Sequence, residues 1–420
     1  MLLNLGPEAD IVASEVYNLL LTYAQLQRQH SSFKLNPTSK AAAPIFHYSW
    51  YRQINDEAHK FRNPSTTTAK AVWAVSKQHG HCLTGTPAQN SLLDFHPLFK
   101  FLGVTHENVD VLNIYEQKIY SKRQQGPIIN KSAKKLFDLI KKDFCIFRSK
   151  SDVDSETGRP LVMLPSCTDL IIDIALSVEE RIIYSHIKEM SLHIFATLTR
   201  LRQACDHPSL VQRVLQDGAG SDQSEENISL RTMVKSQGSL ATMSRKLPRA
   251  ARNPFSDFFR SSKLKAMLQI LHKCKGQKTI IFTHFTSFIP VIAQALHSAN
   301  IRWAEYTGGT SHKDQEEALM QIAEDEECSV IIISILAGSV GLNITSCNKH
   351  YTHGTVDQAI ARVHRIGQML PITVYRLVVQ ESIEKSILKK QQLKREMIGD
   401  MYGDVAGDPC GDLDEATRRA

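Results

Sequence analysis

The fold of this chain is decided by the segment Ser329-Val330-Ile331-Ile332-Ile333-Ser334, which contains three consecutive isoleucines. An apolar run this short, bounded by polar residues, predicts a buried β-strand. A second run of this kind is Lys278–Thr283. Strands that are apolar along their whole length are typical of a parallel sheet covered on both faces by helices.

Around these two runs, strand-like and helix-like segments alternate from residue 261 to residue 400. Such alternation predicts an α/β fold with a parallel sheet. The expected strands are Lys278–Thr283, Ile301–Tyr306, Ser329–Ser334 and Ile372–Val379, and the expected helices are Ser262–His272, Phe285–His297, His312–Glu324, Val356–Ile366 and Ser382–Met397.

Residues 1–150 have the pattern of a second, partial α/β unit, and a connector follows it. Residues 216–254 are rich in Gly, Ser and Gln with isolated charges, and we expect them to be disordered because they cannot bury much apolar surface. The expected elements before this segment are strands at Ile11–Ala13, Tyr48–Ile54, His81–Thr84 and Leu170–Ile174, helices at Val16–Gln29 and Thr67–Ser76, and one long helical stretch over residues 177–213.

The composition excludes several classes of protein. The net charge of +7 is compatible with a polyanionic partner but equally with a solvated basic surface. The 8 cysteines form no C-x-x-C pair, so a zinc finger is not expected, and their dispersal suggests a reducing compartment. The N-terminus lacks the pattern of a signal peptide and no segment approaches membrane-spanning length, so we expect no membrane partner.

Two arginines stand three residues apart in Gln358-Ala359-Ile360-Ala361-Arg362-Val363-His364-Arg365-Ile366-Gly367-Gln368. On one helix face, Arg362 and Arg365 could clamp a polyphosphate while charge develops on it, because guanidinium is always charged and donates as a fork. The alternative is a solvated basic helix face. A generic basic face does not need the flanking His364, Gly367 and Gln368.

An acidic string, Asp56-Glu57-Ala58-His59, follows a strand candidate. At such a position one carboxylate, Asp56, can hold Mg²⁺ through water, and Glu57 can polarise an attacking water molecule. The alternative is an acidic surface turn.

Two further strings carry small residues just after predicted strands. His81–Ser91 includes Gly85 and Thr86, and Ala337–Thr345 includes Gly338, Gly341 and Asn343. Glycine at a strand end brings backbone N–H groups close to a bound phosphate. A metal site remains an alternative for His79, His81 and Cys82, as it does for Cys205 with His207, although we expect the latter pair to be structural because Pro208 ends its helix.

Taken together and in this order, these strings resemble the motifs of the Swi/Snf-type helicase-like ATPases of helicase superfamily two. Asp56–His59 resembles motif II, His81–Ser91 motif III, Ala337–Thr345 motif V and Gln358–Gln368 motif VI. Ile280–Thr286 resembles motif IV, and Tyr306–Thr310 the turn that follows the next strand. The likeness is strongest to the branch whose longer members carry a RING finger.

The resemblance implies two RecA-like lobes with parallel sheets that bind ATP and Mg²⁺ between them and double-stranded DNA or chromatin across them. It implies an ATP-dependent DNA translocase of chromatin remodelling or DNA repair, located in the nucleus. The implied catalytic residues are Asp56, Glu57, Arg362 and Arg365, with Asp56 at the metal, and the implied nucleotide or DNA contacts are His59, Gly85, Thr86, Gly338, Gly341, Asn343, Gln358, Gly367 and Gln368.

On this resemblance we expect five parts in the chain. They are a partial first RecA-like lobe at 1–150, lacking its N-terminal portion, a connector and helical protrusion at 151–215, a disordered insertion at 216–260, a second RecA-like lobe at 261–400 and a tail at 401–420.

Two family features are missing from the sequence. No G-x-x-x-x-G-K-[ST] string occurs, so the backbone cradle and lysine that grip the phosphates of ATP are not encoded in these 420 residues. The segment Asn348–Val356 is short, and we expect the strand of the second lobe that precedes motif VI to be absent. A catalytically inactive DNA- or chromatin-binding remnant is therefore the alternative function. An RNA helicase of the DEAH type shares Asp56–His59, but Arg362–Gln368 argues against it.

Overall fold

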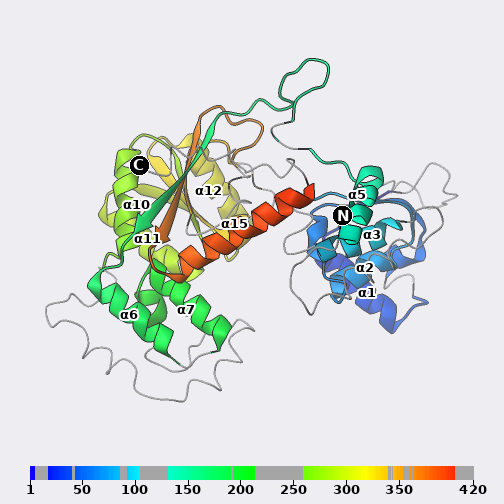
Figure 1. Cartoon of the computed structure of the whole chain (residues 1–420), viewed down its shortest axis with the longest axis horizontal. Helices are drawn as coiled ribbons and strands as arrows, with labels where there is room; N and C mark the ends of the chain where they lie inside the picture. Colours follow the sequence, from blue (N-terminus) through cyan, green and yellow to red (C-terminus); the bar gives the residue numbers. More distant parts are fainter. Residues whose placement is uncertain are drawn as a thin grey trace. The chain divides into compact units, whose positions relative to one another are not determined.

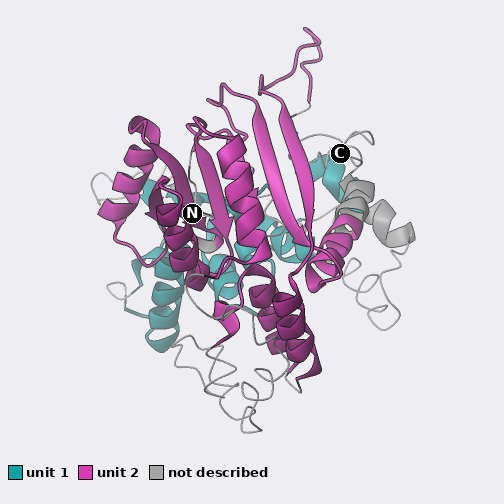
Figure 2. Cartoon of the chain, turned by 90° about the vertical axis from the view of Figure 1, so that its left-hand side faces the viewer, with its two compact units in different colours: residues 1–148, 396–405 teal, residues 149–395, 406–420 magenta. Residues whose placement is uncertain are grey.

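The computed structural model describes residues 1–4, 18–39, 43–85, 92–104, 131–148, 150, 152–190, 193–212, 259–338, 342, 344–352, 360 and 363–402. The chain divides into two compact units (Figure 2). Unit 1 is Met1–Arg148 with Glu396–Val405, and unit 2 is Ser149–Arg395 with Ala406–Ala420.

Unit 2 is built on a six-stranded sheet in which every pair of neighbouring strands is parallel. The α/β class expected from the apolar runs is thereby confirmed. The order across the sheet is β5-β10-β9-β6-β8-β7. The strands are β5 (Cys167–Ile174), β6 (Thr279–Thr283), β7 (Arg302–Tyr306), β8 (Cys328–Ser334), β9 (Lys349–Thr352) and β10 (Ile372–Val379).

Helices cover both faces of this sheet (Figures 1 and 2). On one face, α10 (Ser262–Lys273) and α11 (Ile289–Ser298) pack on Ile281 and Ile332. On the other, α12 (His312–Glu324) packs on Ile331 and Ile333. Neighbouring isoleucines of one strand thus serve opposite cores, which is why the run has no polar alternation.

The strand expected at Leu170–Ile174 is confirmed as β5, which begins earlier, at Cys167, and pairs with β10 along all its 8 residues at the edge of the sheet. One prediction for this unit is wrong. We expected the strand before motif VI to be absent, but β9 lies between β6 and β10. The sequence signal of β9 is weak because it carries polar residues, and pairing with apolar neighbours places it.

Beside the sheet lie α6 (Val178–Glu189) and α7 (Ile194–Asp206) (Figure 1). The single long helical stretch expected here is therefore interrupted after Met190. A buried ionic cluster ties α7 to the core: Lys263 Nζ lies 2.8 Å from Asp206 Oδ1 and 2.6 Å from Glu384 Oε1. Glu384 belongs to α15 (Ile383–Tyr402).

Unit 1 contains a four-stranded sheet in the order β2-β1-β3-β4. The pair β3 (Trp50–Asn55) and β4 (Lys77–Cys82) is parallel, whereas β1 (Leu2–Asn4) is antiparallel to both β3 and β2 (Asn18–Leu20). Within the described part of residues 1–148 the α-helices are α1 (Tyr23–Leu35), α2 (Thr67–Ala74), α3 (His96–Leu102) and α5 (Lys131–Phe144). The helix expected over Val16–Gln29 begins only at Tyr23, because Thr22 caps it with its hydroxyl oxygen.

Candidate functional site

The acidic string forms a turn at the carboxyl end of β3, in which Asp56 is exposed, Glu57 and His59 are half-buried and Ala58 is buried. Asp56 follows the last strand residue directly, and its Oδ1 accepts the backbone N–H of Glu57 at 2.9 Å. The hydroxyl of Tyr23 donates to the Asp56 carbonyl at 2.8 Å. Glu57 has φ 49° and ψ 49°, the left-handed conformation that side chains rarely adopt. Such local strain is characteristic of functional sites, where surrounding contacts hold it in place.

The turn is fastened to the next parallel strand by hydrogen bonds. Leu83 N–H donates to the Asn55 carbonyl at 2.8 Å, and Ala58 N–H donates to the Leu83 carbonyl at 2.9 Å. His59 Nδ1 lies 3.2 Å from Thr84 Oγ1. Because the carboxyl ends of parallel strands meet at one edge of a sheet, motif II and the start of motif III touch here.

His59 is half-buried and connects the two strings chemically. Its Nδ1 lies 3.2 Å from Glu57 Oε2 as well as from Thr84 Oγ1. Burial lowers the pKa of His59, although the Glu57 carboxylate opposes this shift. The imidazole is therefore neutral at neutral pH. Its Nδ1 can donate to the Glu57 carboxylate when it carries the proton, or accept from the Thr84 hydroxyl when it does not.

The acidic turn has the donor chemistry that suits Mg²⁺. This ion takes one or two carboxylates and completes its shell with water and substrate phosphate oxygens, which an exposed turn permits. Across the described parts of the chain, no group of three or more His, Cys, Asp or Glu side chains could form an all-protein metal site. The alternative metal site at His79, His81 and Cys82 therefore gains no support.

Cys205 and His207, the second metal alternative, have a structural role. His207 Nε2 lies 2.8 Å from the Phe259 carbonyl oxygen and its Nδ1 lies 2.8 Å from Ser209 Oγ. Both ring nitrogens are thus engaged by the protein itself. Cys205 is buried, and burial raises the pKa of its thiol, which disfavours the thiolate that a metal needs.

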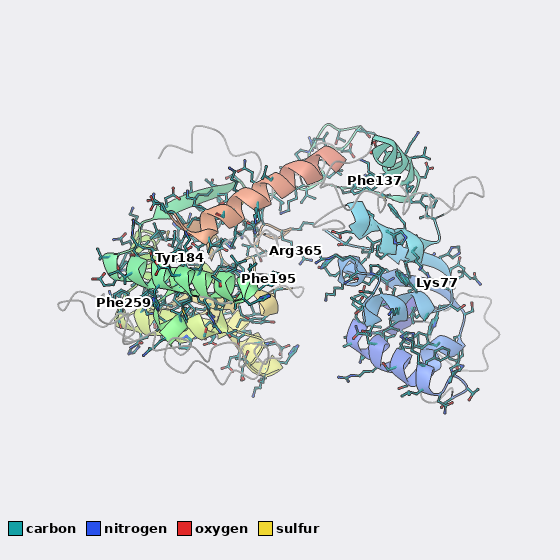
Figure 3. All side chains as sticks on the ribbon, turned by 60° about the horizontal axis from the view of Figure 1, so that its bottom comes forward. Lys77, Phe137, Tyr184, Phe195, Phe259 and Arg365 are labelled. Carbon is teal, nitrogen blue, oxygen red and sulfur yellow. The ribbon has the colours of Figure 1, made fainter. Side chains whose placement is uncertain are left out.

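In unit 2, Arg365 lies in a turn just before β10 with its side chain exposed (Figure 3). The last helix-type hydrogen bond runs from His364 N–H to the Ile360 carbonyl at 2.9 Å, whereas Arg365 N–H bonds to Val363. The helix expected over Val356–Ile366 therefore does not continue through Arg365. Gly367, with φ 101°, makes the reversal that leads into β10.

Gln368 fixes this turn to the segment that enters β9. Its Nε2 donates to the Cys347 carbonyl at 2.9 Å, and its Oε1 accepts the N–H groups of Met369 and Leu370 at 3.0 and 2.9 Å. Gln368 is 4% exposed, so its amide is occupied in holding the backbone. This structural role was not apparent from the sequence, which suggested a ligand contact.

The remaining predicted residues divide between described and undescribed positions. Gly338 ends the short helix α13 (Ile335–Gly338) after β8. Gly85 follows β4 in a bend, where an added Cβ would meet no atom within 4 Å. The predicted site residues that lie outside the described residues are Thr86, Gly341, Asn343, Gln358 and Arg362.

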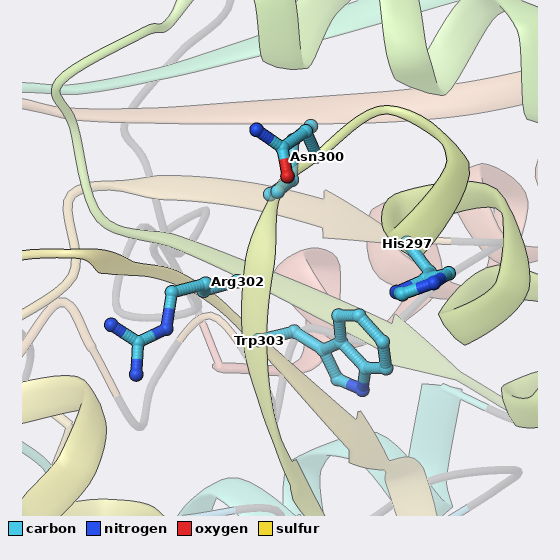
Figure 4. A pocket seen from close by; sticks show the side chains of 5 residues that line it. His297, Asn300, Arg302 and Trp303 are labelled. Carbon is cyan, nitrogen blue, oxygen red and sulfur yellow. The ribbon is translucent and has the colours of Figure 1, made fainter.

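A shallow hollow of about 190 Å³ lies between the end of α11 and the start of β7 (Figure 4). Trp303 and His297 form one wall, with their rings edge to face. Arg302 is held by ion pairs with Asp325 and Glu327. The hollow lies at the amino end of β7, and ligands of parallel sheets bind at the carboxyl ends. It therefore adds nothing to the candidate site.

Comparison with known proteins identifies two matching families. Residues 9–210 match the family described as SNF2-related domain, and residues 262–368 match the helicase conserved C-terminal domain. The matches span the motifs in both units, in the order expected from the sequence. The chain belongs to the SNF2-related ATPases.

Curated relatives of this SNF2-related chain include several DNA repair proteins. The DNA repair protein RAD5A of Arabidopsis thaliana is 25% identical, over 81% of this chain and 42% of its own length. The DNA repair protein RAD5 of Yarrowia lipolytica is 26% identical, over 90% of this chain and 47% of its own length. The helicase-like transcription factor CHR28 of Arabidopsis thaliana is 24% identical, over 83% and 49%. The chain thus spans less than half the length of these relatives.

The SNF2-related chain is also similar to two solved structures. The Sulfolobus solfataricus SWI2/SNF2 ATPase core in complex with double-stranded DNA has a TM-score of 0.40 and 22% identity, over 91% of this chain and 73% of that one. The C-terminal part of the Fun30 ATPase domain has a TM-score of 0.40 and 17% identity, over 58% of this chain and 98% of that one.

Among the described helices of the SNF2-related chain, none has the length and apolar character needed to cross a membrane.

Proposed function

We propose that these residues act in a DNA-dependent ATPase that moves along double-stranded DNA or chromatin during DNA repair, in the nucleus. Unit 1 would be the first RecA-like lobe and unit 2 the second. Asp56 would hold the Mg²⁺ that accompanies ATP, Glu57 would orient the attacking water, and Arg362 and Arg365 would neutralise charge on the transferring phosphoryl group. The family assignment and the DNA repair proteins among the relatives support this proposal.

The observation that carries the proposal is the acidic turn and its link to the next strand. Asp56 is exposed where a solvated ion could reach it, and Glu57 lies in a strained left-handed conformation. Through His59 the position of Glu57 depends on Thr84, which lies within motif III. A conformational change in motif III would therefore move the Glu57 carboxylate that orients water. DNA contact would be coupled to hydrolysis in this way.

For the other predicted residues we propose contacts to nucleotide or DNA phosphates. Gly85 follows β4 and Gly338 ends α13 after β8, and Thr86, Gly341 and Asn343 come shortly after them in the sequence. Backbone N–H groups that follow strand ends can meet an anion. We propose that Gln358, Gly367 and Gln368 shape motif VI, with Gln368 doing so through Cys347.

The 420 residues contain no G-x-x-x-x-G-K-[ST] string, so they lack the usual means of gripping the β- and γ-phosphates. We therefore propose that this stretch, tested by itself, hydrolyses ATP only weakly. A version extended with the genomic sequence upstream of Met1 would recover hydrolysis if that sequence encodes the missing loop.

The test is DNA-stimulated ATP hydrolysis by the 420-residue chain and by the extended version. Glu57→Gln is the matched control, because it keeps the size of the side chain but removes the carboxylate that orients water. We expect the extended version to hydrolyse ATP and its Glu57→Gln variant to lose at least about a hundredfold in rate. Hydrolysis that does not change on Glu57→Gln would refute the assignment of Glu57.

The second candidate is a DNA- or chromatin-binding remnant without turnover. The exposed lysines of α15, Lys389 and Lys390 among them, favour it, because phosphate contacts need no nucleotide. It predicts duplex affinity that falls steeply with salt, together with no hydrolysis by either version. Hydrolysis by the extended version would exclude it.

A further inference from the structure

The turn that carries Arg365 is held from two sides. On one side Gln368 anchors it to Cys347. On the other side the preceding residue, His364, is held by a segment almost 200 positions earlier in the chain. His364 is 8% exposed, whereas Arg365 beside it is exposed. The contacts of buried His364 therefore set the backbone position from which the exposed side chain of Arg365 extends.

His364 is gripped by two groups of the segment that leads into β5. Its Nε2 lies 2.9 Å from the Pro165 carbonyl oxygen. Since a carbonyl oxygen can only accept, Nε2 carries the proton and donates. Nδ1 is then the acceptor of a neutral ring, and it faces Lys150 Nζ at 3.3 Å.

Lys150 also donates to the backbone carbonyl oxygen of His364 at 2.7 Å. One ammonium thus contacts both the ring and the backbone of the residue before Arg365, and bonds from a charged donor are stronger than neutral ones. Lys150 is exposed as a whole residue, and only the desolvation of its ammonium by these contacts lowers its pKa. The two contacts, not burial of the side chain, are therefore what fixes its tip.

The position of Lys150 in the chain gives this contact its interest. The first stretch of unit 1 ends at Arg148 and unit 2 begins at Ser149, so Lys150 is the second residue after one of the crossings between the units. A displacement of this crossing would reach His364 through Lys150.

We propose that Lys150 is a positioning residue for Arg365, and that it makes the place of the motif VI arginine depend on the segment connecting the two units. The proposal rests on the proposed role of Arg365 in phosphoryl transfer. Its structural half, that Lys150 holds the turn, does not depend on that role and is tested separately.

The structural half is tested by hydrogen exchange of backbone amides in the 420-residue chain, compared with Lys150→Met, Lys150→Arg and the exposed-lysine control Lys275→Met. In Lys150→Met we expect the amides of residues 364–368 to exchange about tenfold faster, the size expected for losing a hydrogen bond from a charged group. Lys150→Arg restores a charged donor and stays within about twofold of the parent, as does Lys275→Met. Unchanged exchange at 364–368 in Lys150→Met overturns the proposal, as does equal acceleration in β6 and β8, which would mean global destabilisation.

The functional half is tested by steady-state hydrolysis in the extended version. We expect Lys150→Met to lower kcat about tenfold or more while leaving the KM for ATP and the duplex affinity within about twofold, because a displaced guanidinium weakens only the transition state. Lys150→Arg recovers most of the rate. An unchanged kcat overturns the positioning role even if exchange at 364–368 rises. If the extended version shows no Glu57-dependent hydrolysis, the proposed function fails, and the exchange experiment still decides whether Lys150 holds the turn.

Discussion

Replacing His350 with isoleucine is expected to stabilise unit 2 and to remove part of its sensitivity to acid. His350 lies in β9, in the middle of the sheet, and is 1% exposed. Neither of its ring nitrogens has a hydrogen-bond partner among the described residues. Its ring stacks on Phe282, with centroids 6.2 Å apart. Isoleucine has a similar volume and favours a strand, so it should fill the site without the unmet polar groups.

The magnitude follows from two terms. A buried polar group without a partner costs about 1–3 kcal/mol, so we expect His350→Ile to raise the free energy of unfolding by about that amount at pH 7.5. Burial, helped by the nearby His364 and Lys349, lowers the pKa of His350 from 6.5 to about 3. His350 therefore binds a proton near pH 6.5 in the unfolded state but remains unprotonated in the folded state at that pH. The contribution of His350 to the free energy of unfolding is fully present above pH 6.5 and falls as the pH is lowered, by about 2 kcal/mol at pH 5.

The assay is urea unfolding at pH 7.5 and at pH 5, followed by tryptophan fluorescence. Trp303 is the tryptophan of unit 2, and the transition that a Trp303→Phe variant loses identifies this unit. The loss of stability between the two pH values should be smaller in His350→Ile than in the parent by about 2 kcal/mol. The exposed His312, replaced by glutamine, is the control and should leave both values unchanged. If His350→Ile is no more stable at pH 7.5 and loses as much on acidification as the parent, the account of a neutral, unpaired His350 is wrong.

Three further outcomes are expected. Lys263→Met should lower the free energy of unfolding by about 3–5 kcal/mol in thermal melts, since it leaves the buried carboxylates Asp206 and Glu384 without their cation; a loss below about 1 kcal/mol would contradict this. Gly367→Ala should cost about 1–2 kcal/mol in urea unfolding because alanine must adopt φ 101° there, and a neutral effect would show that the turn relaxes. Glu57→Gly should raise the free energy of unfolding of unit 1 by up to about 1 kcal/mol by relieving the left-handed strain, while abolishing hydrolysis in the extended version; a loss of stability would mean that Glu57 contributes more through His59 than its backbone costs.

The site could be predicted from the sequence only where motif and strand end coincide. Asp56 and Glu57 follow a strand, so their place at the carboxyl edge of the sheet was predictable. The role of Gln368 was not, because its amide bonds to Cys347, which lies 21 positions earlier. Lys150 was missed for the same reason, since its partner His364 lies 214 positions later. No local pattern encodes such pairs.

By itself the sequence determined the class of the fold and the order of its motifs. Apolar runs such as Ser329–Ser334 require burial on both faces of the strand, because removing apolar side chains from water is favourable on either face. Only the tertiary structure decided which further segments completed the sheet. Lys349–Thr352 carries too many polar residues to be recognised as a core strand, and it joins the sheet because its backbone N–H and C=O groups find partners beside β10 and β6. Leu170–Ile174 was recognisable as a strand, but only its pairing with β10 shows that it belongs to this sheet.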